Sequence, residues 1–168
     1  MAATNTLIVF ASRHGNVEKF ARKIFDLIDG KVDICNLNNR ESFPDASTYD
    51  SIIVGGSIYH GKIQEKVSKF CFHNIEILKN KRLGLFISCG YSGEKAEKEL
   101  REAFPPELFA KAVASDYFGG KIDNSRLSFL ERIIANQLSE SGELTQSVSQ
   151  EKIKKFAQKM NQSNVVEK

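Results

Sequence analysis

Residues 7–17 read Leu7-Ile8-Val9-Phe10-Ala11-Ser12-Arg13-His14-Gly15-Asn16-Val17 and decide the fold. The first five are apolar, which predicts a strand that is buried on both faces. From Val17 to Ile28, apolar residues recur three or four positions apart, which predicts an amphipathic helix over 16–29. Because a helix begins with unpaired N–H groups and a partial positive charge, this stretch predicts a phosphate site at the turn.

Apolar runs and helical patterns alternate along the rest of the chain. The predicted strands cover residues 6–11, 31–37, 51–56, 83–88 and 112–118, and the predicted helices cover 16–29, 64–78, 93–104 and 149–161. The third and fourth runs are continuously apolar, which is typical of parallel strands covered by helices on both faces. The pattern therefore predicts an α/β fold, a doubly wound five-stranded parallel sheet with right-handed crossovers.

Length and composition favour one cytoplasmic domain. The chain has 168 residues, of which 41% are hydrophobic and 27% charged, as expected of a single globular domain. It begins with too short and polar a segment for a signal peptide, and no run reaches the ~20 apolar residues of a membrane span. Cys35, Cys71 and Cys89 follow no metal-binding spacing, so we expect a reducing environment and no metal site. A net charge of +3 does not indicate a nucleic-acid partner.

One connection is longer than this pattern requires. Residues 119–147 separate the fifth predicted strand from the last predicted helix, where about 2–6 residues are usual. Their apolar residues at positions 127, 130, 133, 134 and 138 predict an extra amphipathic helix over 124–138. We therefore expect a single domain over 1–168 with an insert at about 119–147, which either packs on the core or contacts a partner or a membrane surface.

Three loops meet at one edge of the predicted sheet, because ligands of doubly wound sheets bind at the carboxyl ends of the strands. The candidate cofactor-binding residues are Ser12, Arg13, His14, Gly15, Asn16 and Val17 in the first loop, Ser57, Ile58, Tyr59, His60 and Gly61 in the second, and Ser88, Cys89, Gly90 and Tyr91 in the third. Their small residues leave backbone donors accessible to a phosphate, and a tyrosine can lie against a flat ring. The three loops thus favour a phosphorylated planar cofactor.

Each of these residues also has an interpretation that needs no ligand. Ser12 and Asn16 are residue types favoured at the start of any helix. Cys89 fits a small buried residue, and Tyr91 and Tyr59 fit ordinary loop packing. We interpret Tyr91 as the residue that stacks on the ring, and leave Tyr59 open.

Other phosphate-binding classes lack a residue that they require. The nucleotide-hydrolysing loop GxxxxGK[ST] is absent, and Gly15 alone does not make the dinucleotide motif GxGxxG. A receiver domain needs acidic residues at the end of the first strand, where this chain has none. A cysteine phosphatase needs an arginine to close the loop that begins at Cys89, and Lys95 stands at that distance.

Over nearly its whole length, the chain resembles the flavodoxin-like FMN-binding domains. Ser12, Gly15 and Asn16 match the phosphate loop of that family, whereas His14 and Val17 stand where threonines are usual. The resemblance implies a sheet of order 2-1-3-4-5 and FMN as the cofactor. It also implies that backbone amides of residues 13–17 surround the phosphate.

A closer resemblance is to the menaquinone-dependent protoporphyrinogen dehydrogenase class of flavodoxin-like proteins. Ser12-Arg13-His14-Gly15 is similar to its [S/T]-R-x-G loop. Gly55-Gly56-Ser57-Ile58-Tyr59-His60-Gly61 is similar to its G-x-S-I-x-x-G loop. The long connection after the fifth strand falls where that class carries an insert.

Together these observations predict an FMN-dependent oxidoreductase that passes electrons to a redox partner protein, a quinone or a small molecule. No catalytic side chain is expected, because the flavin itself carries the redox chemistry. The three loops contain Arg13, His14, His60 and Lys62 but no acid, which predicts that they stabilise the anionic reduced flavin. Two alternatives stay open: protoporphyrinogen dehydrogenase activity, and an interaction module that has kept the fold and lost the cofactor.

Overall fold

The computed structural model describes residues 4–12, 15–119 and 141–162, and their strands form one sheet. The strands are β1 (Asn5–Phe10), β2 (Lys31–Asn36), β3 (Ser51–Tyr59), β4 (Lys62–Ile63), β5 (Arg82–Cys89) and β6 (Ala114–Gly119). The five long strands run parallel in the order β2-β1-β3-β5-β6, which confirms the predicted α/β parallel sheet. The order differs in detail from the predicted one because a sixth, two-residue strand, β4, pairs antiparallel to β3.

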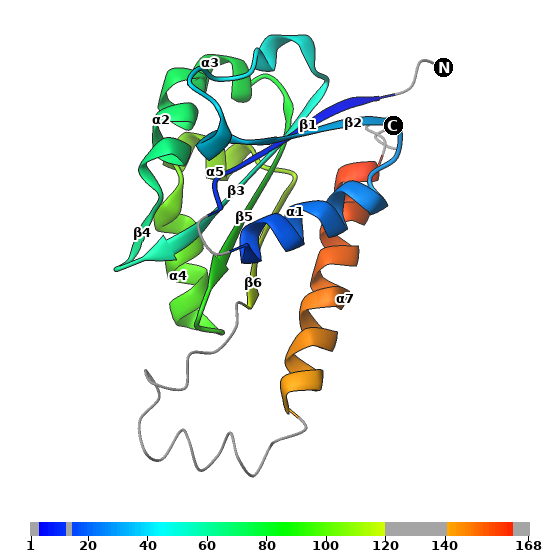
Figure 1. Cartoon of the computed structure of the whole chain (residues 1–168), viewed down its shortest axis with the longest axis vertical. Coiled ribbons are helices and arrows are strands. Elements are labelled where there is room, and N and C mark those ends of the chain that lie inside the picture. Colours follow the sequence, from blue (N-terminus) through cyan, green and yellow to red (C-terminus); the bar gives the residue numbers. More distant parts are fainter. Residues whose placement is uncertain (1–3, 13–14, 120–140, 163–168) are drawn as a thin grey trace.

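Helices cover both faces of this sheet, as Figure 1 shows. One face carries α1 (Asn16–Leu27) and α7 (Ser141–Asn161). The other face carries α2 (Glu65–His73), α3 (Ile75–Leu78), α4 (Glu94–Ala103) and α5 (Pro106–Lys111). Short 3-10 turns at Leu37–Asn39 and Ala46–Thr48 lie between β2 and β3.

The strands are continuously apolar because their alternating side chains enter two different cores. In β1, Leu7 and Val9 pack under the α2–α5 layer, whereas Ile8 and Phe10 pack under α1 and α7. At Gly84 in β5 a side chain would collide with α7, because a Cβ atom would lie 2.8 Å from the sulfur of Met160. The glycine thus lets α7 approach the sheet closely.

Several element boundaries differ from the predicted ones. The helix predicted over 64–78 breaks at Asn74, whose backbone and side-chain N–H groups both donate to the carbonyl of Phe70, at 3.1 and 2.9 Å. The helix α5 was not predicted, although Pro106 occupies its first turn, where proline is favoured. It occupies the chain up to Lys111, so β6 begins at Ala114 rather than at residue 112.

The connection after β6 is shorter than predicted. Helix α7 begins at Ser141, eight residues before the predicted start, so residues 141–147 belong to a helix rather than to a long insert. The helix predicted over 124–138 lies outside the described residues. Within the described ranges, no helix is long and apolar enough to cross a lipid bilayer.

Candidate functional site

The register of the parallel strands brings the three predicted loops to one edge of the sheet. Phe10 at the end of β1 pairs with Gly55, and two residues further on Ser57 pairs with Ser88 of β5. The last residue of β5, Cys89, pairs with Gly119. Since these strands are parallel and end at the same edge, the chain leaves β1, β3 and β5 on that side of the sheet (Figure 1).

The first loop ends in a left-handed glycine. Gly15 has φ 87° and ψ −10°, and it is the N-cap residue immediately before α1. Its N–H donates to the hydroxyl oxygen of Ser12 at 3.0 Å, so Ser12 closes the turn. Val17 is buried in the core and Asn16 is half-buried, while Arg13 and His14 lie outside the described residues. The first N–H groups of α1 have no earlier helical turn to bind, which leaves them for an anion at this edge.

The second predicted loop is largely a hairpin. Strand β3 continues to Tyr59, so Ser57, Ile58 and Tyr59 are strand residues, which corrects the predicted strand end at residue 56. His60 and Gly61, with φ 50° and 78°, form a two-residue turn that returns the chain into β4. Positive φ at both positions is what a tight hairpin turn requires, and glycine supplies it without strain.

A cavity of ≈ 330 Å³ lies beside this hairpin. It is lined by Asn38, Tyr59, Lys62, Ile63, Gln64, Glu65 and Lys66. Among the described residues of the first and third loops, none lines it, so the cavity adjoins the predicted cofactor site and is not identical with it. Gln64 contacts both the cavity and the predicted cofactor site, because it lines the cavity and its side-chain oxygen accepts from the N–H of Ser57 at 2.8 Å.

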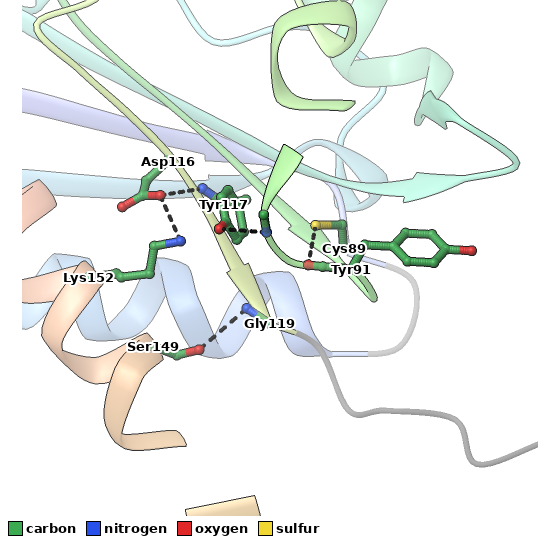
Figure 2. A network of polar contacts seen from close by, with 8 residues as sticks. Cys89, Tyr91, Asp116, Tyr117, Gly119, Ser149 and Lys152 are labelled. Atoms are coloured by element: carbon green, nitrogen blue, oxygen red, sulfur yellow. Dashed lines mark hydrogen bonds and ion pairs between the residues drawn. The ribbon is translucent and has the colours of Figure 1, made fainter. Parts of the chain in front are cut away.

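In the third loop, only part of the predicted set faces outward. Ser88 and Cys89 are the last residues of β5 and are buried. Burial raises the pKa of the Cys89 thiol, which therefore stays protonated at neutral pH; the thiol donates to the Tyr91 carbonyl at 3.4 Å. The Tyr91 side chain is 51% exposed and points away from the sheet (Figure 2), with the Lys95 ammonium 3.6 Å from its ring centre.

Four glycines in these loops each have open space where a side chain would lie. At Gly15, Gly61, Gly90 and Gly93, a Cβ atom would meet no other atom within 4 Å. The backbone at these four positions is therefore accessible, which is what a phosphate and a flat ring require of a binding site. The residues present fit a phosphorylated planar cofactor.

The structure also shows residues that support the loops and that no local pattern indicated. The Asn38 side chain donates to the Ser12 carbonyl at 2.9 Å, and Tyr117 in β6 accepts from the N–H of Gly93 at 3.1 Å. Lys152 in α7 contacts Tyr117 in turn. These contacts join residues 24 or more positions apart, so neither periodicity nor a short motif could reveal them. Among the described residues, no three His, Cys, Asp or Glu side chains gather where they could hold a metal ion.

Comparison with known proteins agrees with this architecture. The model of the flavodoxin domain family matches residues 7–149, which is most of the chain. The chain therefore belongs to the flavodoxin domain family. No curated protein matches its sequence significantly.

Solved structures with the same fold are distant in sequence. A flavodoxin from the domain Archaea is 16% identical, with a TM-score of 0.54 over 94% of this chain and 99% of that one. The two-electron reduced flavodoxin of Megasphaera elsdenii is 18% identical, with a TM-score of 0.56 over 91% and 98%. A WrbA-like flavodoxin from Agrobacterium tumefaciens is 11% identical, with a TM-score of 0.59 over 94% and 98%. At these identities the likeness shows the fold.

Proposed function

We propose that the chain binds FMN non-covalently and transfers electrons from a donor to a redox partner protein, a quinone or a small molecule. One observation carries the proposal: the left-handed Gly15 opens α1 beside the hairpin and the exposed Tyr91, at the carboxyl edge of a flavodoxin-like sheet. A flavodoxin among its structural neighbours is described as two-electron reduced, which is consistent with this class of chemistry.

The roles of the chain's own residues follow from their positions. Backbone N–H groups at the start of α1 bind the phosphate, and the Ser12 hydroxyl, which already accepts from Gly15, has its own proton to donate. The exposed Tyr91 packs against one face of the ring. When bound, FMN supplies the electron-accepting ring, so the protein needs to orient it and adjust its potential.

Charge at this edge favours the reduced cofactor. Lys62 is exposed at the hairpin, and Arg13, His14 and His60 belong to the same loops, which contain no acid. The fully reduced ring carries a negative charge, so nearby cations raise the potential of the second one-electron step. We therefore propose two-electron oxidoreduction with little accumulation of the one-electron form.

A second, narrower candidate is a quinone-linked protoporphyrinogen dehydrogenase. The segment Gly55–Gly61 favours it, because the residues that resemble that class's second loop build the β3–β4 hairpin beside the open edge. Anaerobic mixing with protoporphyrinogen and a menaquinone analogue tests it directly. Porphyrin fluorescence should then appear at a rate that depends on bound FMN.

The main proposal is tested with purified protein that is mixed separately with FMN, FAD and NAD. We expect one FMN per chain by calorimetry, a flavin absorption spectrum after gel filtration, and much weaker retention of FAD or NAD. Anaerobic reduction of the FMN-loaded protein then resolves the two one-electron steps. A chain that retains no flavin would favour the interaction module, and tighter FAD binding would contradict the single phosphate site.

A further inference from the structure

Strand β6 lies at the end of the sheet, and side chains accept hydrogen bonds from backbone N–H groups on its outer edge. It pairs only with β5 among the described strands, so alternate N–H groups on its other side have no strand to bind. The Asp116 carboxylate accepts from the N–H of Tyr117 at 2.8 Å, and the Ser149 hydroxyl accepts from the N–H of Gly119 at 3.3 Å. Ser149 belongs to α7, so this hydrogen bond joins the helix to the end of β6 (Figure 2).

Lys152, one turn further along α7, makes two contacts at the same place. Its ammonium lies 3.0 Å from the Asp116 carboxylate and 3.1 Å from the centre of the Tyr117 ring. The two charged side chains are 23% and 26% exposed, less than either partner of the other ion pairs in the described part of the chain. Partial burial reduces screening by water and salt, so this pair is stronger than an ordinary surface pair.

Tyr117 connects Lys152 to the third loop. Its hydroxyl oxygen accepts from the N–H of Gly93 at 3.1 Å, and Gly93 is the N-cap residue immediately before α4. At its other end, the loop is held by the contact of the Cys89 thiol with the Tyr91 carbonyl at 3.4 Å. Figure 2 shows the series of contacts from Lys152 through Tyr117 to the loop that bears Tyr91.

We propose that Lys152 is a positioning residue, which acts through Asp116 and Tyr117 to hold residues 89–93 in the conformation that presents Tyr91 to a flat ligand. Because the Tyr117 ring is held by the ammonium at its face, its hydroxyl stays within reach of Gly93. The part of this proposal that concerns FMN rests on the function proposed above. The part that concerns the loop holds for the protein without cofactor as well.

The test compares four variants of the full chain. Lys152→Met removes the charge at similar length, Lys152→Arg restores it, and Tyr117→Phe removes only the hydroxyl. Lys155→Met is the matched control, because Lys155 is exposed on the same helix. Circular dichroism and thermal unfolding establish that each variant folds.

Two measurements separate positioning from general stability. Hydrogen exchange of the Gly93 amide, without FMN, should quicken about tenfold in Lys152→Met and Tyr117→Phe and stay unchanged in Lys155→Met. The FMN dissociation constant, from flavin fluorescence, should rise about three- to tenfold in the same two variants and return towards the unmodified value in Lys152→Arg.

Other outcomes would overturn the proposal. If the Gly93 amide exchanges as slowly in Lys152→Met as in the Lys155→Met control, the ammonium does not hold the loop. If it exchanges at the unmodified rate in Tyr117→Phe, the Tyr117 hydroxyl does not hold the loop. Faster exchange with an unchanged FMN dissociation constant removes the role toward the ligand. If the unmodified chain binds no FMN, the proposed function fails, and the exchange data still decide whether Lys152 holds the loop.

Discussion

The first loop, after β1, and the third loop, after β5, lie at the same edge of the sheet but differ in what fixes their turns. In the first loop, the turn is closed locally, because Ser12 accepts from Gly15 three positions away and Gly15 supplies the left-handed conformation; Asn38 adds one contact, to the Ser12 carbonyl. In the third loop, the Cys89–Tyr91 contact is local, but Gly93 is held by Tyr117, 24 positions away, and through Tyr117 by Lys152 of α7. A phosphate site can therefore be encoded in one short motif, whereas the conformation of the Tyr91 loop depends on the assembled fold.

The largest effect is expected at Gly15, where the first loop depends on a single backbone conformation. Gly15→Val should raise the FMN dissociation constant about 30- to 100-fold, because an L-residue at φ 87° costs about 1–2 kcal/mol and a branched side chain covers the loop N–H groups. Calorimetric titration with FMN measures the change.

Gly15→Asn is the matched control, since asparagine tolerates the left-handed region better than valine does. It should retain most of the binding. Equal loss in both variants would show that open space at Gly15, rather than its φ, is what the site needs. Unchanged affinity in Gly15→Val would place the phosphate elsewhere and end the contrast between the loops.

The same contrast explains which features the sequence could predict. Burial on both faces makes β1, β3 and β5 continuously apolar, so the parallel α/β sheet and the first loop are visible in local patterns. The break at Asn74 and the helix at Pro106 depend on side-chain hydrogen bonds and packing that periodicity does not record. The two-residue strand β4 arises from a turn whose only sequence signal is Gly61.

In the candidate site too, local features were predictable from the sequence and contacts between distant residues were not. Ser12 and Gly15 form the turn before α1, and Tyr91 is exposed in the third loop, while the binding roles of all three stay predictions. Ser88 ends the predicted strand and is buried, whereas Cys89, predicted as a loop residue, is the buried last residue of β5, because the strand continues to its pairing with Gly119. No local pattern indicates Lys152, because its contacts arise only when α7 packs on β6.

The next prediction separates α7 from the residues that precede it. We expect a chain in which residues 120–140 are replaced by a short Gly/Ser linker to fold and to bind FMN. Gly119 and Ser149 are joined by a hydrogen bond of 3.3 Å, so a short linker spans the distance to the start of α7, and loop closure depends only weakly on length.

Turnover with the physiological partner should fall at least about tenfold if these residues contribute to the partner's binding site. Thermal unfolding, FMN titration and partner-dependent oxidation measure the three properties. A linker chain that fails to fold would assign the apolar residues of 120–140 to the core. One that folds but loses FMN would show that support of the third loop begins before α7.

A smaller effect tests the third loop itself. Tyr91→Ala should weaken FMN binding about five- to thirtyfold and increase the fluorescence of bound flavin, because an aromatic contact is worth about 1–2 kcal/mol and quenches the ring. Tyr59→Ala is the comparison, since Tyr59 lines the neighbouring cavity at the hairpin. If Tyr59→Ala alone has this effect, the hairpin rather than the Tyr91 loop covers the ring, and the dependence on Lys152 should disappear with it.

The smallest effect is expected from the positive charges of the first loop and the hairpin, which act on the potential of the bound flavin. Arg13→Glu combined with Lys62→Glu should lower the potential of the second one-electron step by about 20–40 mV, because exposed charges act on the anionic reduced ring mainly through solvent. Lys111→Glu reverses one charge, half the change of the double variant, at the opposite edge of the sheet before β6 begins, and should leave the potential unaltered. Raising the salt concentration should reduce the shift, since the Lys62 side chain is exposed.

A very low potential of the second one-electron step in the unmodified protein would contradict the proposed two-electron behaviour. The cations of the first loop and of the hairpin would then not stabilise the reduced ring. The phosphate loop would in that case bind the cofactor without adjusting it, and the remotely held Tyr91 loop would be the region that sets the potential.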